Sequence, residues 1–220
     1  MLALYFTTKI RNNGKGDNAN TRKTRIWYPG AIYHIMQRGI RRKEIYTTEG
    51  DYQYCLALLE KELGRYHCTL HAYCFMTNHY HLLLETSDKE IWRFMKTFSQ
   101  NYARYYNAQH AYTGHLFEGR YVSVLVEDDE YFLQVSRYIH LNPVKAHMCM
   151  SAEQYKYSSY RSIINVESDK VTNAEKTLKY FQDKSVIKYR EFVNDIGHKY
   201  EIHEDSIKKS VGEDDLWLPW

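Results

Sequence analysis

The sequence contains no long apolar run. None of its 220 residues lie in a stretch approaching the length of about eighteen apolar residues that a helix needs to cross a membrane. Residues 1–10 are mildly apolar, but they are too short for a secretory signal peptide and lack its basic start. We therefore expect a cytoplasmic protein without a membrane span.

Cysteine is also scarce. The chain has four cysteines, Cys55, Cys68, Cys74 and Cys149, and no two of them form a CxxC pair. Their positions match neither the ligand spacing of a zinc finger nor a disulfide framework. We expect reduced thiols that are mostly buried, in agreement with a cytoplasmic protein.

Acidic residues are missing from one part of the chain. The net charge is only +3, but no Asp or Glu lies between Arg22 and Glu44, and this stretch contains Arg22, Lys23, Arg25, Arg38, Arg41, Arg42 and Lys43. Such a patch attracts a phosphate backbone, although charge runs are more often ordinary solvated faces. Residues 201–215 are acidic and are not expected to lie along a nucleic acid. The expected nucleic-acid contacts are Arg25, Arg38, Arg41, Arg42, Lys43 and, at the start of a later strand, Arg120.

The order of the expected strands and helices predicts the fold. Strands are expected at 31–37, 69–75, 79–85 and 120–126, and helices at 51–66, at 89–108 and from 128 or 129 to about 142. This βαββαβ order, followed by a further helix, predicts an α+β fold of the ferredoxin-like type. In that fold an antiparallel sheet has its helices on one face, and the third strand lies centrally.

The chain divides into three parts by composition. Residues 1–24 should be a flexible basic arm, and residues 25–150 should form the main domain. Residues 151–220 should be an accessory helical segment, with helices near 174–184 and 186–196.

The most informative motif is Asn78-His79-Tyr80-His81, which leads directly into the apolar residues 82–84. Residues two apart in a strand point to the same face, so His79 and His81 should stand side by side. Two parallel imidazoles on a rigid backbone form half of a site for a divalent metal ion. A His-x-His pair alone is more often part of a surface or a core, so the metal site is a hypothesis.

A second motif, Tyr138-Ile-His-Leu-Asn142-Pro143, falls on the helix expected after residue 128. Residues four apart lie about 40° from each other around a helix, so Tyr138 and Asn142 can present a phenol and an amide oxygen to one point. Pro143 has no backbone N–H, and the helix should end or kink around Asn142. Taken alone, Tyr138 could be one of 22 tyrosines and simply pack in a core. Asn142, taken alone, could be a residue that ends a helix before a proline.

Four pieces of the chain together resemble the single-tyrosine transposases with a His-hydrophobe-His motif. Among these, the chain looks closest to the REP-associated tyrosine transposases, which are relatives of the IS200-type enzymes. The resemblance runs from about Arg22 to Ala146, and its pieces are RIWYPGAIYH at 25–34, NHYH at 78–81, GHLFEGRY at 114–121 and YIHLNPV at 138–144. Tyr80 stands where the family has a bulky apolar residue.

The resemblance implies a site and a chemistry. His79, His81 and Asn142 would bind Mg²⁺ or Mn²⁺, and Tyr138 would be the nucleophile. The enzyme would be an HUH-type endonuclease and strand transferase that cuts and rejoins single-stranded or hairpin DNA through a covalent phosphotyrosine. A bound cation would offset the charge of the phosphodiester, although these ligands would also accept Zn²⁺. Relatives act as monomers or as homodimers that exchange the catalytic helix, and the sequence leaves this choice open.

The second function considered is a nucleic-acid-binding domain of the same fold without catalysis, because a similar sheet serves RNA-recognition modules. On that view Trp27 or Tyr121 could stack on a base, but each could equally pack in the core. The chain lacks the aromatic-rich RNP signature on a strand, and a pure binder gives no reason for His79, His81 and Tyr138 to occur together. Relaxases also pair histidines with a tyrosine, but there the tyrosine generally comes first. The combined pattern favours the transferase.

Overall fold

A four-stranded sheet forms the centre of the molecule. The computed structural model describes residues 26–195, and its strands are β1 (Ile32–Arg38), β2 (Thr69–Phe75), β3 (His79–Glu85) and β4 (Val122–Val126). The strand order is β2-β3-β1-β4, and every neighbouring pair is antiparallel. This is the strand order of the ferredoxin-like fold, so the predicted α+β class and the central position of the third strand are confirmed.

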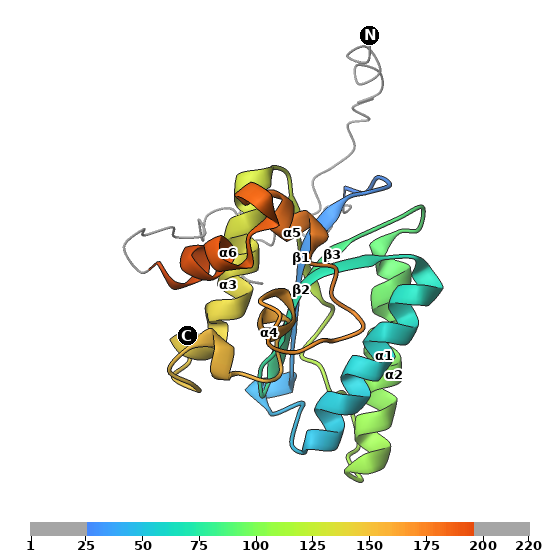
Figure 1. Ribbon diagram of the computed structural model, residues 1–220. Helices are drawn as coiled ribbons and strands as arrows, with labels where there is room; N and C mark the ends of the chain where they lie inside the picture. Colours follow the sequence, from blue (N-terminus) through green and yellow to red (C-terminus); the bar gives the residue numbers. More distant parts are fainter. Residues whose placement is uncertain (1–25, 196–220) are drawn as a thin grey trace, which may run out of the picture.

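Two long helices, α1 (Glu49–Tyr66) and α2 (Ile91–Gln109), cover one face of the sheet (Figure 1). Alternate strand residues, including Tyr33, Leu82 and Leu84, pack with these helices in the main apolar core. The start of α1 is fixed by Asp51, whose carboxylate accepts the backbone N–H of Thr48 at 2.8 Å. The helices expected at 51–66 and 89–108 are therefore present, and both lie on one face of the sheet as predicted.

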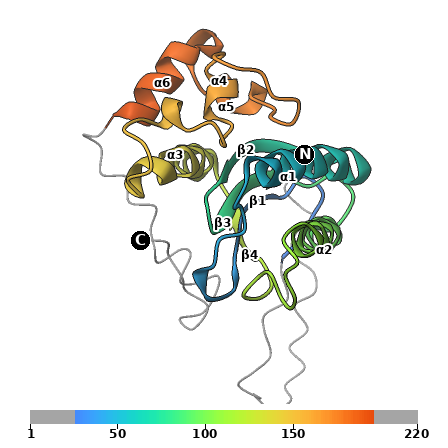
Figure 2. The ribbon, with the colours of Figure 1, turned by 90° about the horizontal axis from the view of Figure 1, so that it is seen from below.

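The third long helix, α3 (Asp129–Lys145), lies on the opposite face of the sheet (Figure 2). Asp128 begins it by accepting the backbone N–H of Tyr131 at 2.7 Å. The helix does not end at Asn142, because the backbone N–H of Ala146 bonds to the Asn142 carbonyl at 2.9 Å and restores the helical pattern beyond Pro143. Pro143 removes one hydrogen bond from the helix without terminating it.

The residues after α3 form a layer of short helices, α4 (Tyr160–Ile163), α5 (Glu175–Lys179) and α6 (Val186–Asn194). The expected helix at 174–184 is wrong in length, because it stops after Lys179 and a separate 3₁₀ turn follows at Gln182–Lys184. Asp183 in that turn has a φ of 56°, a left-handed conformation that cannot continue an α-helix. The expected helix near 186–196 is present as α6.

All four cysteines are free thiols, with Cys55 and Cys74 buried and Cys68 and Cys149 half-buried. Within residues 26–195 no helix has both the length and the apolar character required to cross a membrane. The predicted arm at 1–24 lies outside the described residues.

Candidate functional site

His79 and His81 project from β3 toward α3. The sheet register places His81 opposite Met36 of β1 and His79 opposite Arg38, and both histidines are buried. Strand alternation sends Tyr80 to the other face, where it packs in the core beneath α1 and α2. The motif therefore turns both imidazoles toward the same helix, as the sequence predicted.

Each of the two histidines has its Nδ1 occupied by a neighbouring side chain. The Nδ1 of His79 lies 2.6 Å from Oδ1 of Asn78, and the Nδ1 of His81 lies 3.0 Å from Nε2 of His34. The Nε2 of His81 is buried and has no hydrogen-bond partner among the described residues. Contacts of this kind fix the tautomer and orientation of a metal-binding histidine, with Nε2 left to face the ligand.

His34 is a site residue to which the sequence reasoning assigned no role. It lies on β1, next to β3 in the sheet, and it is fully buried with its ring 5.2 Å from that of His81. Its position two residues before Met36, the register partner of His81, puts it on the same face as that histidine. Only the strand pairing reveals this contact, because 47 residues separate His34 from His81.

The three histidines are neutral at physiological pH. Burial lowers the pKa of His34 to about 3, and burial together with the nearby Arg38 guanidinium lowers the pKa of His79 to about 4. The pKa of His81 also lies well below its ordinary value, through burial and then through His79 and His34. Neutral imidazoles keep the lone pairs that a metal ion or a hydrogen-bond donor requires.

Tyr138 on α3 meets the histidines edge to face. Its ring centroid lies 5.5 Å from that of His81 and 5.7 Å from that of His34, and the side chain is largely buried. The ammonium of Lys145, two turns further along the helix, lies 5.1 Å from the centre of the Tyr138 ring. The structure thus brings the predicted phenol into contact with His81, one of the two predicted imidazoles, and it adds a cation that the sequence reasoning missed.

Asn142 is buried one turn beyond Tyr138. Its side-chain nitrogen donates to the Tyr138 carbonyl at 2.9 Å. This bond uses the donor end of the amide, so the acceptor oxygen is the group that remains for another ligand.

The donor set at this site suits a divalent cation. Two neutral imidazoles and an amide oxygen are chemically suitable ligands, and the unpartnered Nε2 of His81 is a buried acceptor that such an ion would satisfy. In the part of the chain that the structure describes, no three His, Cys, Asp or Glu side chains are grouped to hold a metal ion. A cation here therefore needs Asn142, water or substrate oxygens to complete its coordination.

The predicted basic contacts separate into two groups. Arg41, Arg42, Lys43 and Arg120 are exposed, as expected for residues that meet a phosphate backbone. Arg38 is buried instead, and its Nε and a terminal nitrogen both donate to Glu118, at 2.9 and 2.6 Å. Arg25 lies outside the described residues.

Three of the exposed basic residues, Arg41, Arg42 and Lys43, lie on a short loop that is anchored next to the histidines. Gly39 begins this loop, and a Cβ on it would lie only 2.2 Å from the Lys43 carbonyl oxygen, so the tight turn requires glycine. The Gly39 N–H donates to the Asn78 carbonyl at 2.8 Å, and the Asn78 side chain donates to the Arg42 carbonyl at 3.2 Å. The basic loop is therefore anchored at the residue that precedes His79.

Trp27 and Tyr121 pack with the main core, and the Trp27 indole donates to the Lys89 carbonyl at 3.2 Å.

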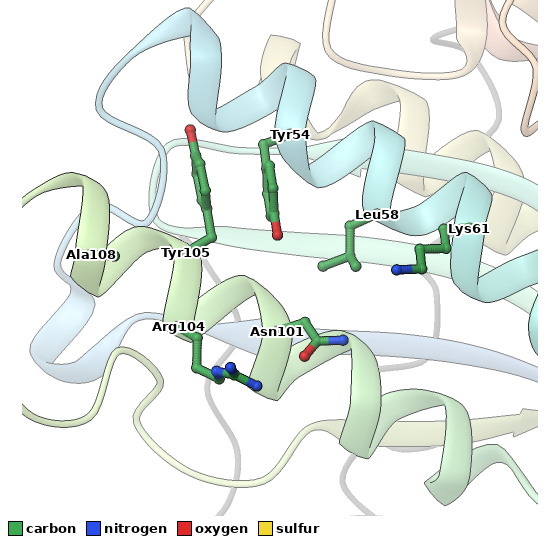
Figure 3. A pocket seen from close by; sticks show the side chains of 7 residues that line it. All are labelled: Tyr54, Leu58, Lys61, Asn101, Arg104, Tyr105 and Ala108. Carbon is green, nitrogen blue, oxygen red and sulfur yellow. The ribbon is translucent and has the colours of Figure 1, made fainter.

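A groove of about 490 Å³ lies between α1 and α2, as Figure 3 shows. It is on the face of the sheet away from α3, so it does not belong to the histidine site. Its lining consists of Tyr54, Leu58, Lys61, Asn101, Arg104, Tyr105 and Ala108.

The family model described as IS200-like transposase matches residues 28–142, which span every site residue from His34 to Asn142. The chain belongs to this family. No curated protein matches this IS200-like transposase sequence significantly.

One solved structure supports the fold of this IS200-like transposase. One match is a REP-associated tyrosine transposase bound to a REP hairpin, with a TM-score of 0.55, 14% identity, and coverage of 70% of this chain and 93% of that one. A tRNA(His) guanylyltransferase from Saccharomyces cerevisiae matches with a TM-score of 0.41 and 9% identity over 89% of this chain and 82% of its own. The first match shows a shared fold, and the second is too distant to carry an argument.

Proposed function

We propose that this transposase cuts and rejoins single-stranded DNA at hairpin-forming sequences through a covalent bond between Tyr138 and a DNA phosphate. The observation that carries the proposal is the contact of the Tyr138 ring with the rings of His81 and His34. These two histidines lie on β3 and β1, on the face of the sheet that α3 covers. A tyrosine that only filled the core would not require two oriented, neutral histidines beside it. The hairpin substrate is suggested by the related transposase of known structure, which is bound to a REP hairpin.

In the proposed reaction the Tyr138 oxygen forms a bond to the phosphorus, and the bond from that phosphorus to the neighbouring nucleotide's oxygen breaks. The Tyr138 hydroxyl gives its proton to solvent and the leaving oxygen takes a proton from solvent. The phosphotyrosine keeps the strand attached until a free strand end attacks it in the reverse reaction. The Lys145 ammonium beside the Tyr138 ring favours negative charge on the phenol oxygen and on the approaching phosphate. No nucleotide cofactor is required, because one phosphoester bond replaces another.

His79 and His81, with Asn142, are the residues that would hold Mg²⁺ or Mn²⁺. When bound, the cation would offset the phosphate charge and favour the phenolate. Asn78 and His34 orient the two imidazoles through the Nδ1 contacts at 2.6 and 3.0 Å. If the cation were held by Nε2 of His81, the ring proton of His81 would lie on Nδ1, and His81 would donate to Nε2 of His34.

We assign the exposed basic residues to the DNA backbone. Arg41, Arg42 and Lys43 lie on the loop anchored at Asn78, so they would hold phosphates close to the histidines. Arg120 is exposed as well, and Arg25 is retained from the sequence pattern. Arg38 has a different role, because it is paired with Glu118 and places a buried positive charge near His79.

A covalent-adduct assay tests the proposal. Labelled single-stranded DNA with a hairpin stem is incubated with the protein and Mn²⁺, and adducts that survive denaturation are separated on a gel. We expect an adduct with the wild type and none with Tyr138→Phe, which lacks the attacking oxygen. The matched control is Tyr131→Phe, because the Tyr131 hydroxyl on the same helix has no hydrogen-bond partner in the described region.

An undiminished adduct with Tyr138→Phe would remove Tyr138 as the nucleophile. DNA binding without an adduct on any hairpin substrate would support the alternative, a catalytically inactive nucleic-acid-binding domain. An adduct that forms equally well after removal of all divalent metal would contradict the assignment of His79 and His81 as metal ligands.

A further inference from the structure

The helix that carries Tyr138 is held from its opposite side by the residues that follow it. At about 100° per residue, Ser136 and His140 lie about 40° from each other and about 160° from Tyr138 around the axis of α3. Tyr138 faces the sheet, while Ser136 and His140 contact α6 and the segment before α4. Figure 2 shows α4, α5 and α6 gathered in a layer next to α3.

A buried hydrogen-bond network connects these elements. His140 Nδ1 lies 2.8 Å from the Tyr189 hydroxyl of α6, and His140 Nε2 lies 2.8 Å from the Ser159 hydroxyl. The Tyr189 hydroxyl also lies 2.7 Å from Oγ of Ser136. All four side chains are fully buried, and both nitrogens of the His140 ring have partners. Such a network fixes both the position and the rotation of α3, because a buried polar group that loses its partner is costly.

The same network reaches the sheet. The Ser159 hydroxyl accepts the backbone N–H of Tyr73 at 2.8 Å, and the Ser159 N–H donates to the Tyr73 carbonyl at 3.0 Å. Two residues along β2, the N–H of Phe75 donates to the Tyr157 carbonyl at 2.9 Å. Residues 157–159 therefore bind the outer edge of β2, and Ser159 joins that strand directly to His140 on α3.

Three further hydrogen bonds connect α3 to the following residues. The Arg137 guanidinium donates to the backbone carbonyls of Val193 and Asp195 at the end of α6, and the Tyr180 hydroxyl bonds to Asp129 at the start of α3. An apolar cluster fills the space between them, made of Ala152, Tyr160, Ile163, Ile164, Tyr189 and Val193 with Leu141 and Val144 of α3 against it. The contacts extend along the whole length of the helix.

We propose that residues 151–195 are a clamp that holds α3 against its own sheet, with His140 as the positioning residue for Tyr138. The clamp makes the phenol act on the histidines of the same chain. The catalytic part of this inference rests on the proposed function, whereas the holding of α3 does not. A roll of α3 by about 20° would move a side-chain tip about 6 Å from the axis by about 2 Å. Misplacement of a reacting group by about 1 Å can slow a reaction by about 100-fold.

The test uses two substitutions that keep the size of the side chain, Ser159→Ala and Tyr189→Phe, in the full-length protein. We expect amide hydrogens of α3 to exchange at least 10-fold faster and the single-turnover rate of adduct formation to fall at least 10-fold. The dissociation constant for the hairpin DNA should stay within about twofold, because the exposed basic loop is untouched. The matched controls are Thr177→Val and Tyr131→Phe, which remove buried hydroxyls without a hydrogen-bond partner among the described residues, and both should behave as the wild type.

Unchanged exchange of the α3 amides in both variants would overturn the clamp. A loss of adduct rate that only follows a loss of DNA affinity, or of folded protein, would overturn the positioning role of His140. If the wild type itself forms no adduct, the proposed function fails, and the exchange measurement still decides whether residues 151–195 hold the helix.

Discussion

Acid should destabilise the fold through His140, and the size of the effect follows from its burial. Burial lowers the pKa of His140 from its ordinary value of 6.5 to about 3 in the folded protein. Between these two values the unfolded chain binds a proton at this residue and the folded chain does not. Stability that is complete above pH 6.5 is therefore lost steadily as the pH falls. Each pH unit in this range costs about 1.4 kcal/mol, so about 2 kcal/mol is lost at about pH 5.

The measurement compares the free energy of unfolding in urea at neutral pH and at about pH 5, for the wild type and for His140→Gln. The variant should be less stable at neutral pH, because a glutamine amide does not have the shape of the imidazole that bonds to both Tyr189 and Ser159. On acidification, however, the wild type should lose about 2 kcal/mol more than the variant, which cannot be protonated at this position. The buried histidines of the site are present in both proteins, so the difference isolates His140.

The exposed His115 provides the matched control, and His115→Gln should lose as much stability in acid as the wild type. Equal losses in the wild type and His140→Gln would refute the argument, because His140 would then bind its proton as readily in the folded state as in the unfolded one.

Two further predictions concern the candidate site. His34→Ala should weaken Mn²⁺ binding about 10-fold or more in calorimetry, because His81 loses the neighbour that orients its ring, and an unchanged affinity would exclude that role. A mixture of Tyr138→Phe and His81→Ala proteins should form no covalent adduct, because α3 acts on its own sheet. An adduct in the mixture, with neither variant active alone, would show instead that two chains exchange this helix.

The strands β2 and β3 begin and end at the predicted residues because their alternation and flanking turns are local properties of the sequence. The convergence of Tyr138 with His81 was expected from the combined motifs, and the structure places the two rings together. The end of α3 was not predictable from Pro143 alone, since contacts beyond the proline continue the helix.

The environment of Arg38 could not be predicted from the local sequence pattern. In the sequence Arg38 belongs to a basic run, but on β1 it alternates onto the same face as His34, where it pairs with Glu118. That partner lies 80 residues away, and the His34–His81 contact likewise depends on strand register. The attachment of His140 to Ser159 and Tyr189 depends on packing between distant segments in the same way.

Asn78 is more than a turn residue before the histidines, because both ends of its amide are in use. The oxygen holds the ring of His79, and the nitrogen holds the backbone of Arg42. Aspartate at this position would keep the first interaction and lose the second, while leucine would lose both. A single uncharged side chain thus couples the part of the protein that would grip a strand to the part that would cut it, and movement of the loop would be transmitted to the imidazole.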